Sequence, residues 1–198
     1  MTKSEKLSAL KTMNLACCEC ALRSGCKGVV FGEGNIESPV MFVGEGPGQT
    51  EDELGKPFVG RAGELLNKML KEAGFLRQDV YVTNIVKCRP PGNRTPVQAE
   101  METCLPWLRK QFSILKPRYM VLMGLAATHG ILDKDIRMNQ CRGKWFQRGD
   151  IMMMPVYHPA AVLRNPAWRE TCIADFRLVK QVCEDAAGGA EEPQEKRG

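Results

Sequence analysis

The chain has 198 residues, nine cysteines and a formal net charge of +5 at neutral pH. This length suits one domain with a full core, and no stretch approaches the roughly 18 to 20 apolar residues of a membrane helix. The polar first residues do not resemble a signal peptide, so we expect a cytoplasmic protein whose cysteines do not form a disulfide framework.

A pair of cysteines follows the first predicted helix, which spans residues 3–16. Cys17 and Cys20 form a C-x-x-C motif, a spacing that lets two thiolates reach one metal ion or cluster. A thioredoxin-like redox pair follows a strand and opens a helix, whereas this pair follows a helix and precedes a turn. With Cys88 and Cys104 it could form a four-thiolate site, and the spacing leaves zinc, an iron–sulfur cluster and simple burial open. Two neighbouring cysteines stay unassigned, Cys18 and Cys26.

The first central strand is predicted over residues 40–44 and ends in a glycine-rich loop, Gly44-Glu45-Gly46-Pro47-Gly48. Glycines at the carboxyl end of a strand allow a ligand to approach the backbone N–H groups closely. The loop is not a Walker motif, because the Gly-Lys-Ser/Thr ending is missing, and it is not a dinucleotide motif that opens directly into a helix. Acidic residues follow and would repel a polyphosphate: Glu51, Asp52 and Glu53.

Phe58 lies in the next loop, between a proline and a glycine, before a predicted helix over residues 64–73. It is either a core aromatic or a platform on which a flat ligand stacks.

Residues 80–96 hold the densest set of candidate binding residues. The segment begins as a β-branched, apolar strand, and Pro90 and Pro91 end it. In open α/β sheets ligands bind at the carboxyl ends of strands, so we predict a site here. The polar side chains at this end are Asn84, Lys87, Arg89, Asn93 and Arg94.

After this segment we predict a helix with Thr95 as N-cap and Pro96 in its first turn, ending near Leu115. A strand over 119–124 and a helix over 125–132 follow, and His129 in that helix is expected to be a core histidine. The sequence of residues 145–148 is typical of a β-hairpin or of the edge of a sheet.

The fourth strand is predicted over residues 151–157, and Pro155 favours an edge position for it. His158 comes directly after this strand. A closing helix is predicted over 167–187, and the composition of 188–198 predicts a disordered tail.

Four strands alternating with helices predict a single α/β domain over residues 1–187, with a four-stranded, mostly parallel sheet flanked by helices. The polar groups at the strand ends would then converge on one crevice. Phe58, Asn84 and His158 suit a flat, polar, neutral ring, since an amide can distinguish the edge of uracil from that of cytosine. A histidine beside a ring carbonyl can stabilise charge that develops there.

Several motifs in order resemble the family-4 uracil-DNA glycosylases, which have a uracil-DNA glycosylase-like fold. The similar segments lie between Cys17 and Pro166: Gly44-Glu45-Gly46-Pro47-Gly48, Glu51-Asp52, Pro57-Phe58-Val59-Gly60, Asn84 to Pro91, and His158-Pro159-Ala160. The resemblance implies a monofunctional enzyme that hydrolyses the N-glycosidic bond of uracil in DNA.

The resemblance also implies roles for single residues. Phe58 would stack on a flipped uracil, Asn84 would bind its edge, His158 would hydrogen-bond a carbonyl oxygen, and Glu51 would lie near C5 and exclude thymine. Gly46 stands where some other members carry a water-activating aspartate, which leaves Glu45 and Asn93 as candidates for the base. A structural 4Fe-4S cluster would be held by Cys17, Cys20, Cys88 and Cys104.

Contacts with DNA are expected because the base must leave the stack before it can react. Leu163 or Arg164 would fill the gap that the flipped base leaves in the duplex, and three cations would contact phosphates: Lys87, Arg89 and Arg94. We expect a monomer that acts on double- and single-stranded DNA without a covalent intermediate, and a sliding clamp is a candidate partner.

Two other classes of protein remain as alternatives. A non-catalytic iron–sulfur or zinc module that binds nucleic acid, or an electron-transfer protein, would need the cysteines but not Phe58, Asn84 and His158 together. The presence of all three favours the enzyme.

Overall fold

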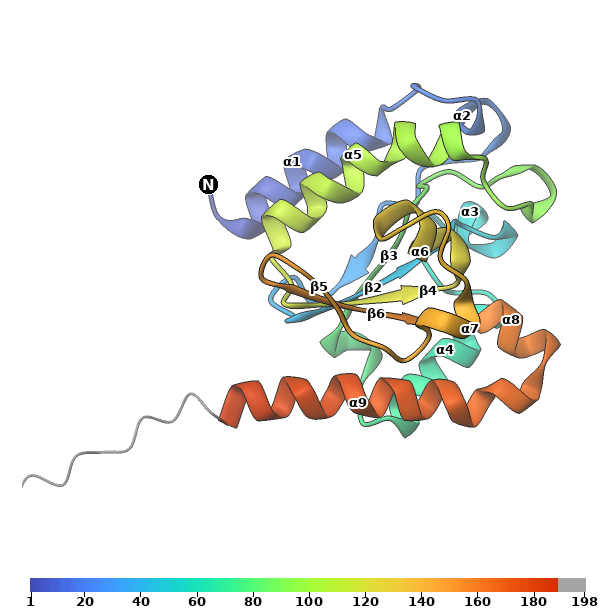
Figure 1. The fold of residues 1–198 in the computed structure, drawn as a ribbon. Coiled ribbons are helices and arrows are strands. Elements are labelled where there is room, and N and C mark those ends of the chain that lie inside the picture. The colour runs from blue at the N-terminus through green and yellow to red at the C-terminus, as the bar shows by residue number, and fades with distance from the viewer. Residues whose placement is uncertain (189–198) are drawn as a thin grey trace, which may run out of the picture.

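The computed structural model describes residues 1–188, which form an α/β fold around one six-stranded sheet (Figure 1). The strand order is β1-β3-β2-β4-β6-β5. The strands are β1 (Glu33–Gly34), β2 (Val40–Gly44), β3 (Tyr81–Asn84), β4 (Tyr119–Met123), β5 (Phe146–Arg148) and β6 (Ile151–Val156).

The predicted α/β class is confirmed, but the predicted number of four strands is wrong. The four predicted strands form the parallel centre, β3-β2-β4-β6, and the short strands β1 and β5 pair antiparallel at the two edges. Strand β1 has only two residues, Glu33 and Gly34, which is too short for a periodic pattern to reveal.

Helices cover both faces of the sheet. Helices α1 (Lys3–Leu15) and α5 (Gln98–Leu115) pack together on one face, and α4 (Arg61–Glu72) and α9 (Arg169–Gly188) pack on the other. The shorter helices are α2 (Leu22–Gly25), α3 (Gln49–Leu54), α6 (Leu125–Ile131), α7 (Met138–Cys141) and α8 (Pro159–Arg164), with 3-10 turns η1 (Arg77–Asp79), η2 (Pro91–Asn93) and η3 (Pro166–Trp168). Within residues 1–188, no helix is both long enough and apolar enough to cross a membrane.

The central strand β2 is buried on both faces, as a parallel strand between two helical layers must be. Met41 and Val43 join the core under α1 and α5, whereas Val40 and Phe42 join the core under α4 and α9. This alternation explains why residues 40–44 are apolar throughout. It also means that a ligand can reach this strand only at its ends.

The start of α5 differs from the prediction. The helix begins at Gln98 with Val97 as N-cap, not at Thr95, because the Glu100 carboxylate accepts a hydrogen bond from the Val97 N–H at 2.9 Å. Arg94 and Thr95 therefore belong to the loop before the helix, and both line the cavity described below. The helix continues through Pro106 to Leu115.

Two other expectations need correction. Strand β6 is not the edge strand, since β5 pairs beside it, but Pro155 lies beyond the last β5 pair, Phe146 with Met153, so its missing N–H interrupts no ladder there. Gly188 belongs to α9, and the rest of the predicted tail, residues 189–198, lies outside the described part of the chain.

Candidate active site

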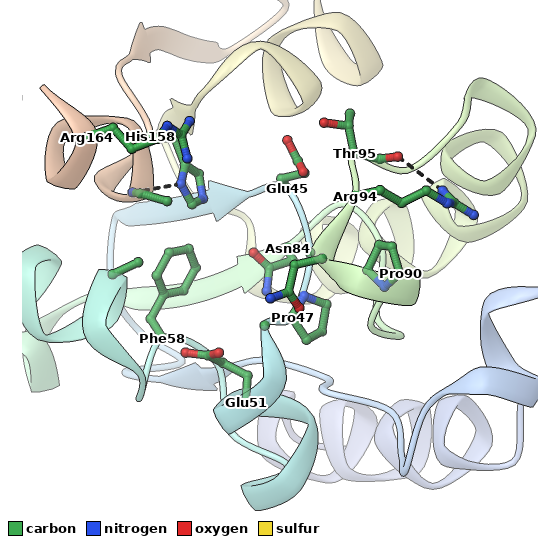
Figure 2. A pocket seen from close by; sticks show the side chains of 15 residues that line it. Glu45, Pro47, Glu51, Phe58, Asn84, Pro90, Arg94, Thr95, His158 and Arg164 are labelled. Atoms are coloured by element: carbon green, nitrogen blue, oxygen red, sulfur yellow. Dashed lines mark hydrogen bonds between the residues drawn. The ribbon is translucent and has the colours of Figure 1, made fainter.

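A cavity of about 410 Å³ opens at the carboxyl ends of β2, β3 and β6 (Figure 2). It lies where open α/β sheets bind ligands. The prediction that these strand ends converge is confirmed. The lining residues include Glu45, Gly46, Glu51, Phe58, Asn84, Asn93, Arg94, His158 and Arg164.

Phe58 is held in an unusual backbone conformation at one wall of the cavity. Its φ is +54°, and the Glu51 carboxylate stabilises the following turn by accepting hydrogen bonds from the Val59 N–H at 2.9 Å and the Gly60 N–H at 2.7 Å. Gly63 permits the turn, because a Cβ there would lie 1.9 Å from the Phe58 carbonyl oxygen. Glu51 therefore lines the cavity and also fixes the aromatic ring beside it.

Asn84 ends β3, and its side chain points into the cavity (Figure 2). The residue is 1% exposed, and its Oδ1 atom has no hydrogen-bond partner in the structure. Buried polar atoms are almost always paired, so an unpaired acceptor facing a cavity indicates a ligand that donates to it. Gly44 on the adjacent strand leaves this space open, since a Cβ there would lie 2.5 Å from both Asn84 Oδ1 and Phe58 Cζ.

His158 faces the same cavity from the start of α8. Its Nδ1 accepts a hydrogen bond from the Ala160 N–H at 3.1 Å, so in the neutral ring the proton is on Nε2, which is buried and unpaired. Burial, together with the positive charge of Arg164, lowers the pKa of His158 to about 4. The imidazole is therefore neutral near pH 7 and presents one N–H to the cavity, with its ring centroid 5.9 Å from that of Phe58.

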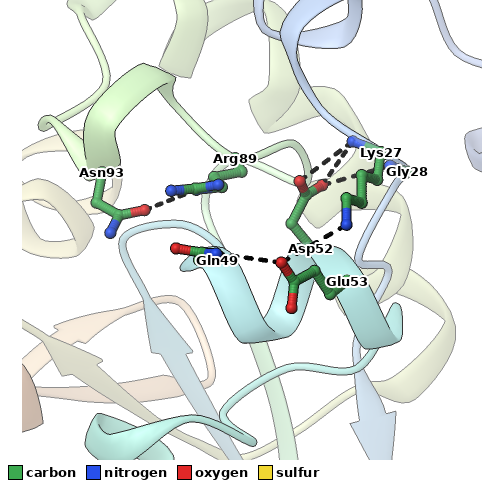
Figure 3. A network of polar contacts seen from close by, with 7 residues as sticks. All are labelled: Lys27, Gly28, Gln49, Asp52, Glu53, Arg89 and Asn93. Carbon is green, nitrogen blue, oxygen red and sulfur yellow. Dashed lines mark hydrogen bonds and ion pairs between the residues drawn. The ribbon is translucent and has the colours of Figure 1, made fainter.

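The two candidates for the catalytic base differ in their surroundings. Burial raises the pKa of the Glu45 carboxyl above its ordinary value, and a hydrogen bond to Thr95 and the charge of Arg164 oppose that rise. Asn93 also lines the cavity, but its Oδ1 accepts from Arg89 Nε at 2.7 Å (Figure 3). Glu45 is thus the candidate with an ionisable group directed to the site.

The prediction that Lys87 contacts DNA is wrong. The residue is 1% exposed, and its ammonium donates three hydrogen bonds to groups inside the protein. Burial lowers its pKa to about 7. A lysine four residues before Pro91 cannot be told from a surface cation by sequence, because its burial depends on α5 packing over it.

The other predicted DNA-binding residues lie around the mouth of the cavity or near it. Leu163 is 40% exposed at the end of α8, and the side chain of Arg164 lines the cavity. Arg94 also lines it, although its guanidinium forms two hydrogen bonds with Glu100, at 2.8 and 2.7 Å. Arg89 is half-buried beside Asn93.

Asp52 has a structural role that no sequence motif indicated. It is buried in α3, and its carboxylate accepts hydrogen bonds from the Lys27 N–H at 2.9 Å and the Gly28 N–H at 3.3 Å (Figure 3). The acidic run after the glycine loop thus holds two backbone turns in place, one through Glu51 and one through Asp52. Since the partner is 25 positions away, no local pattern indicates it.

The four predicted ligand cysteines belong to the core on the α5 side of the sheet, and Cys104 lies on α5 itself. Cys88 and Cys104 are buried, and Cys17 and Cys20 pack against the same core. Burial raises the pKa of the Cys88 thiol, and so do the neighbouring thiols of Cys26, Cys104 and Cys20. The donors thus suit a thiolate-ligated centre chemically, although residues 1–188 contain no set of three or more candidate ligands already arranged around a metal position.

Comparison with known proteins agrees with this geometry. Residues 31–177 match the uracil DNA glycosylase superfamily. A type-4 uracil-DNA glycosylase of Pyrobaculum aerophilum is 46% identical over 162 residues, covering 77% of this chain and 82% of the relative. One from Thermotoga maritima is 41% identical, covering 83% and 86%, and one from Archaeoglobus fulgidus is 36% identical, covering 90% and 94%. The chain therefore belongs to the uracil-DNA glycosylase superfamily, and within it to the type-4 uracil-DNA glycosylases.

Proposed function

We propose that this chain is a uracil-DNA glycosylase that removes uracil from DNA and leaves an abasic site. The observation that carries this is the pair of unpartnered polar atoms in one cavity, Asn84 Oδ1 and His158 Nε2. The first needs a donor, such as the ring N–H of uracil, and the second needs an acceptor, such as a uracil carbonyl oxygen. Phe58 offers the apolar face on which the ring would stack.

The chemistry begins when the nucleotide rotates out of the duplex into the cavity, at a cost of a few kcal/mol. The bond between the sugar and the ring nitrogen then breaks, and its electron pair leaves with uracil. The neutral His158 donates a hydrogen bond from its Nε2–H to the carbonyl oxygen on which negative charge accumulates. This hydrogen bond stabilises the departing anion. Water adds to the sugar carbon that uracil has left, and the proton that this water loses neutralises the uracil anion, which completes the hydrolysis.

Glu45 is the group that we assign to orient this water. Its carboxylate lines the cavity, whereas the Asn93 oxygen is committed to Arg89. Departure of a stabilised anion does not require a strong base, so the contribution of Glu45 is smaller than that of His158.

Contacts to DNA would come from Arg89, Arg94 and Arg164, with Leu163 as the wedge that fills the emptied position. Action on both double- and single-stranded DNA, a monomeric state, a cytoplasmic location and a sliding-clamp partner stay predictions.

The cofactor that we propose is a structural 4Fe-4S cluster on Cys17, Cys20, Cys88 and Cys104. Support comes from four thiols that share one region behind the β3 loop. When bound, the cluster would crosslink the loop after β3 to the segment before α2. Iron and acid-labile sulfide in equal amounts, and their loss in Cys104→Ser, would support this assignment; zinc in place of iron would contradict it.

The test is cleavage of a duplex oligonucleotide with one central uracil, in EDTA and with alkali afterwards to cut abasic sites. Asn84→Ala should reduce the single-turnover rate about 1,000-fold, because the cavity loses the amide that distinguishes the base. Its melting temperature should not fall, since the variant removes an unpaired buried atom. Absence of cleavage by wild-type protein with its brown colour intact would refute the proposal and favour a binding or electron-transfer module.

A further inference from the structure

The side chain of Lys87 is buried between the sheet and α5. Its Nζ donates to Thr83 Oγ1 at 2.6 Å, to the Asn84 carbonyl oxygen at 2.8 Å and to Gln111 Oε1 at 2.6 Å. An ammonium has three hydrogens, and all three are used. In residues 1–188 no carboxylate forms an ion pair with it.

The partners of Lys87 are themselves held in place. Thr83 Oγ1 donates to the Phe31 carbonyl oxygen at 2.9 Å, and Gln111 Nε2 donates to the same oxygen at 2.8 Å and to the Tyr81 hydroxyl at 3.2 Å. The network therefore joins β3, α5 and the segment before β1 without leaving a polar side chain unpaired. A network of this kind is rigid, because each member restricts the next.

The backbone of Lys87 is anchored as well. Its N–H donates to Cys104 Sγ at 3.3 Å, and its carbonyl oxygen accepts from the Val30 N–H at 2.7 Å. One residue thus contacts the cysteine region with its main chain and the end of β3 with its side chain.

The contact with Asn84 matters because of the geometry of a strand. Successive side chains of β3 point to opposite faces, so the Asn84 amide faces the cavity while Thr83 faces α5. Lys87 holds the Asn84 backbone from the α5 side, behind the cavity. A shift of 1 Å in a group that orients a substrate can cost about 100-fold in rate.

We propose that Lys87 is a positioning residue for base recognition, which acts by fixing the backbone of Asn84. This inference rests on the proposed function, since it assigns Asn84 to the uracil edge. It gives the buried lysine a role in place of the phosphate contact that the sequence suggested.

A double-mutant cycle tests the proposal. Lys87→Met keeps an unbranched side chain that is one atom shorter and removes the ammonium, and it should lower the single-turnover rate on uracil DNA about 30-fold in the wild-type background. In the Asn84→Ala background the same change should cost less than about threefold, because the group that it positions is already gone. Equal losses in both backgrounds would overturn the proposal, since a general structural defect does not depend on Asn84.

Free uracil gives a second readout that does not depend on catalysis. Inhibition by free uracil should weaken in Lys87→Met by about the same factor as the rate, while the visible absorbance and iron content stay unchanged. Unchanged inhibition would count against the proposal. Lys68→Met, at an exposed position of α4, is the matched control and should alter neither quantity.

If Lys87→Met does not fold, Thr83→Val replaces it in the cycle, since it removes one acceptor of Lys87 with little change of shape. A smaller loss that again depends on Asn84 is expected, and an independent loss would refute the proposal. Wild-type protein is measured first. If it does not excise uracil, the proposed function fails; if it does and the cycle is additive, only the assignment of Lys87 fails.

Discussion

Two polar regions meet at the end of β3, and they differ in whether their polar atoms are satisfied. On the cavity side, Asn84 Oδ1 and His158 Nε2 are buried without partners. On the α5 side, Lys87 and Gln111 are just as buried, yet each of their donors and acceptors is paired within the protein. Unsatisfied atoms cost stability and are expected where a ligand completes them, whereas a satisfied network supports the fold.

This difference shows why residue type alone is a poor guide to a site. A lysine is commonly assigned to phosphate binding and an asparagine to structure, but here the lysine is internal and the asparagine faces the cavity. The comparison can be tested by removing groups from each kind of site. Changes in the cavity should lower activity without lowering stability. Changes to satisfied groups should lower stability, and they should lower activity only where the group holds Asn84 in place, as Lys87 does.

After Asn84→Ala, the largest effect is expected for His158→Asn. Asparagine can accept the Ala160 N–H as N-cap of α8 but has no equivalent of Nε2. The single-turnover rate should fall about 100-fold, or about 2.7 kcal/mol, through loss of the donor to the departing base. The melting temperature should stay within about 2 °C of wild type. A single-turnover rate equal to that of wild type would show that the unpaired Nε2 is not the catalytic donor.

Asp52→Ala tests a satisfied buried group in α3, outside both of these regions. It removes the acceptor of the Lys27 and Gly28 N–H groups and should destabilise the fold by about 2 kcal/mol, a drop in melting temperature of about 4 to 8 °C. The rate at 25 °C should stay within about threefold of wild type. The control is Glu53→Ala, which loses an exposed ion pair with Lys27 and an exposed hydrogen bond from Gln49, and it should shift the melting temperature little. Equal destabilisation in both would contradict the bracing role of Asp52.

The smallest effect is expected for Glu45→Gln, about tenfold in rate at pH 7.5. The pKa of Glu45 is raised by burial, and the base must be ionised, so wild-type activity should decrease as the pH falls through this raised pKa. The pKa of His158 is about 4, so its protonation does not account for that decrease. The pH–rate profile should be flat on its acid side in Glu45→Gln and should keep its slope in His158→Asn. A slope that persists without Glu45 would exclude it as the base.

Much of the site could be predicted from the sequence because the patterns that indicate it are local. An apolar run followed by glycines or prolines predicts a buried strand with an open carboxyl end, as at Gly44 and Pro90. Three such ends in an α/β order predict convergence, which places Asn84 and His158 in one crevice. The motifs around these residues, which follow one another in the order typical of the family, also indicated the family.

The tertiary structure decided which polar atoms have partners. The burial of Lys87 depends on Gln111, 24 positions away, and the bracing by Asp52 depends on Lys27, 25 positions away. Strand β1 is too short for periodicity, and both β1 and β5 form by antiparallel pairing with β3 and β6, the outer strands of the parallel centre. Sequence patterns record which face of an element is apolar, whereas the partner of a polar group is set by the packing of distant elements. This packing pairs the Lys87 ammonium inside the protein and leaves Asn84 Oδ1 unpaired in the cavity.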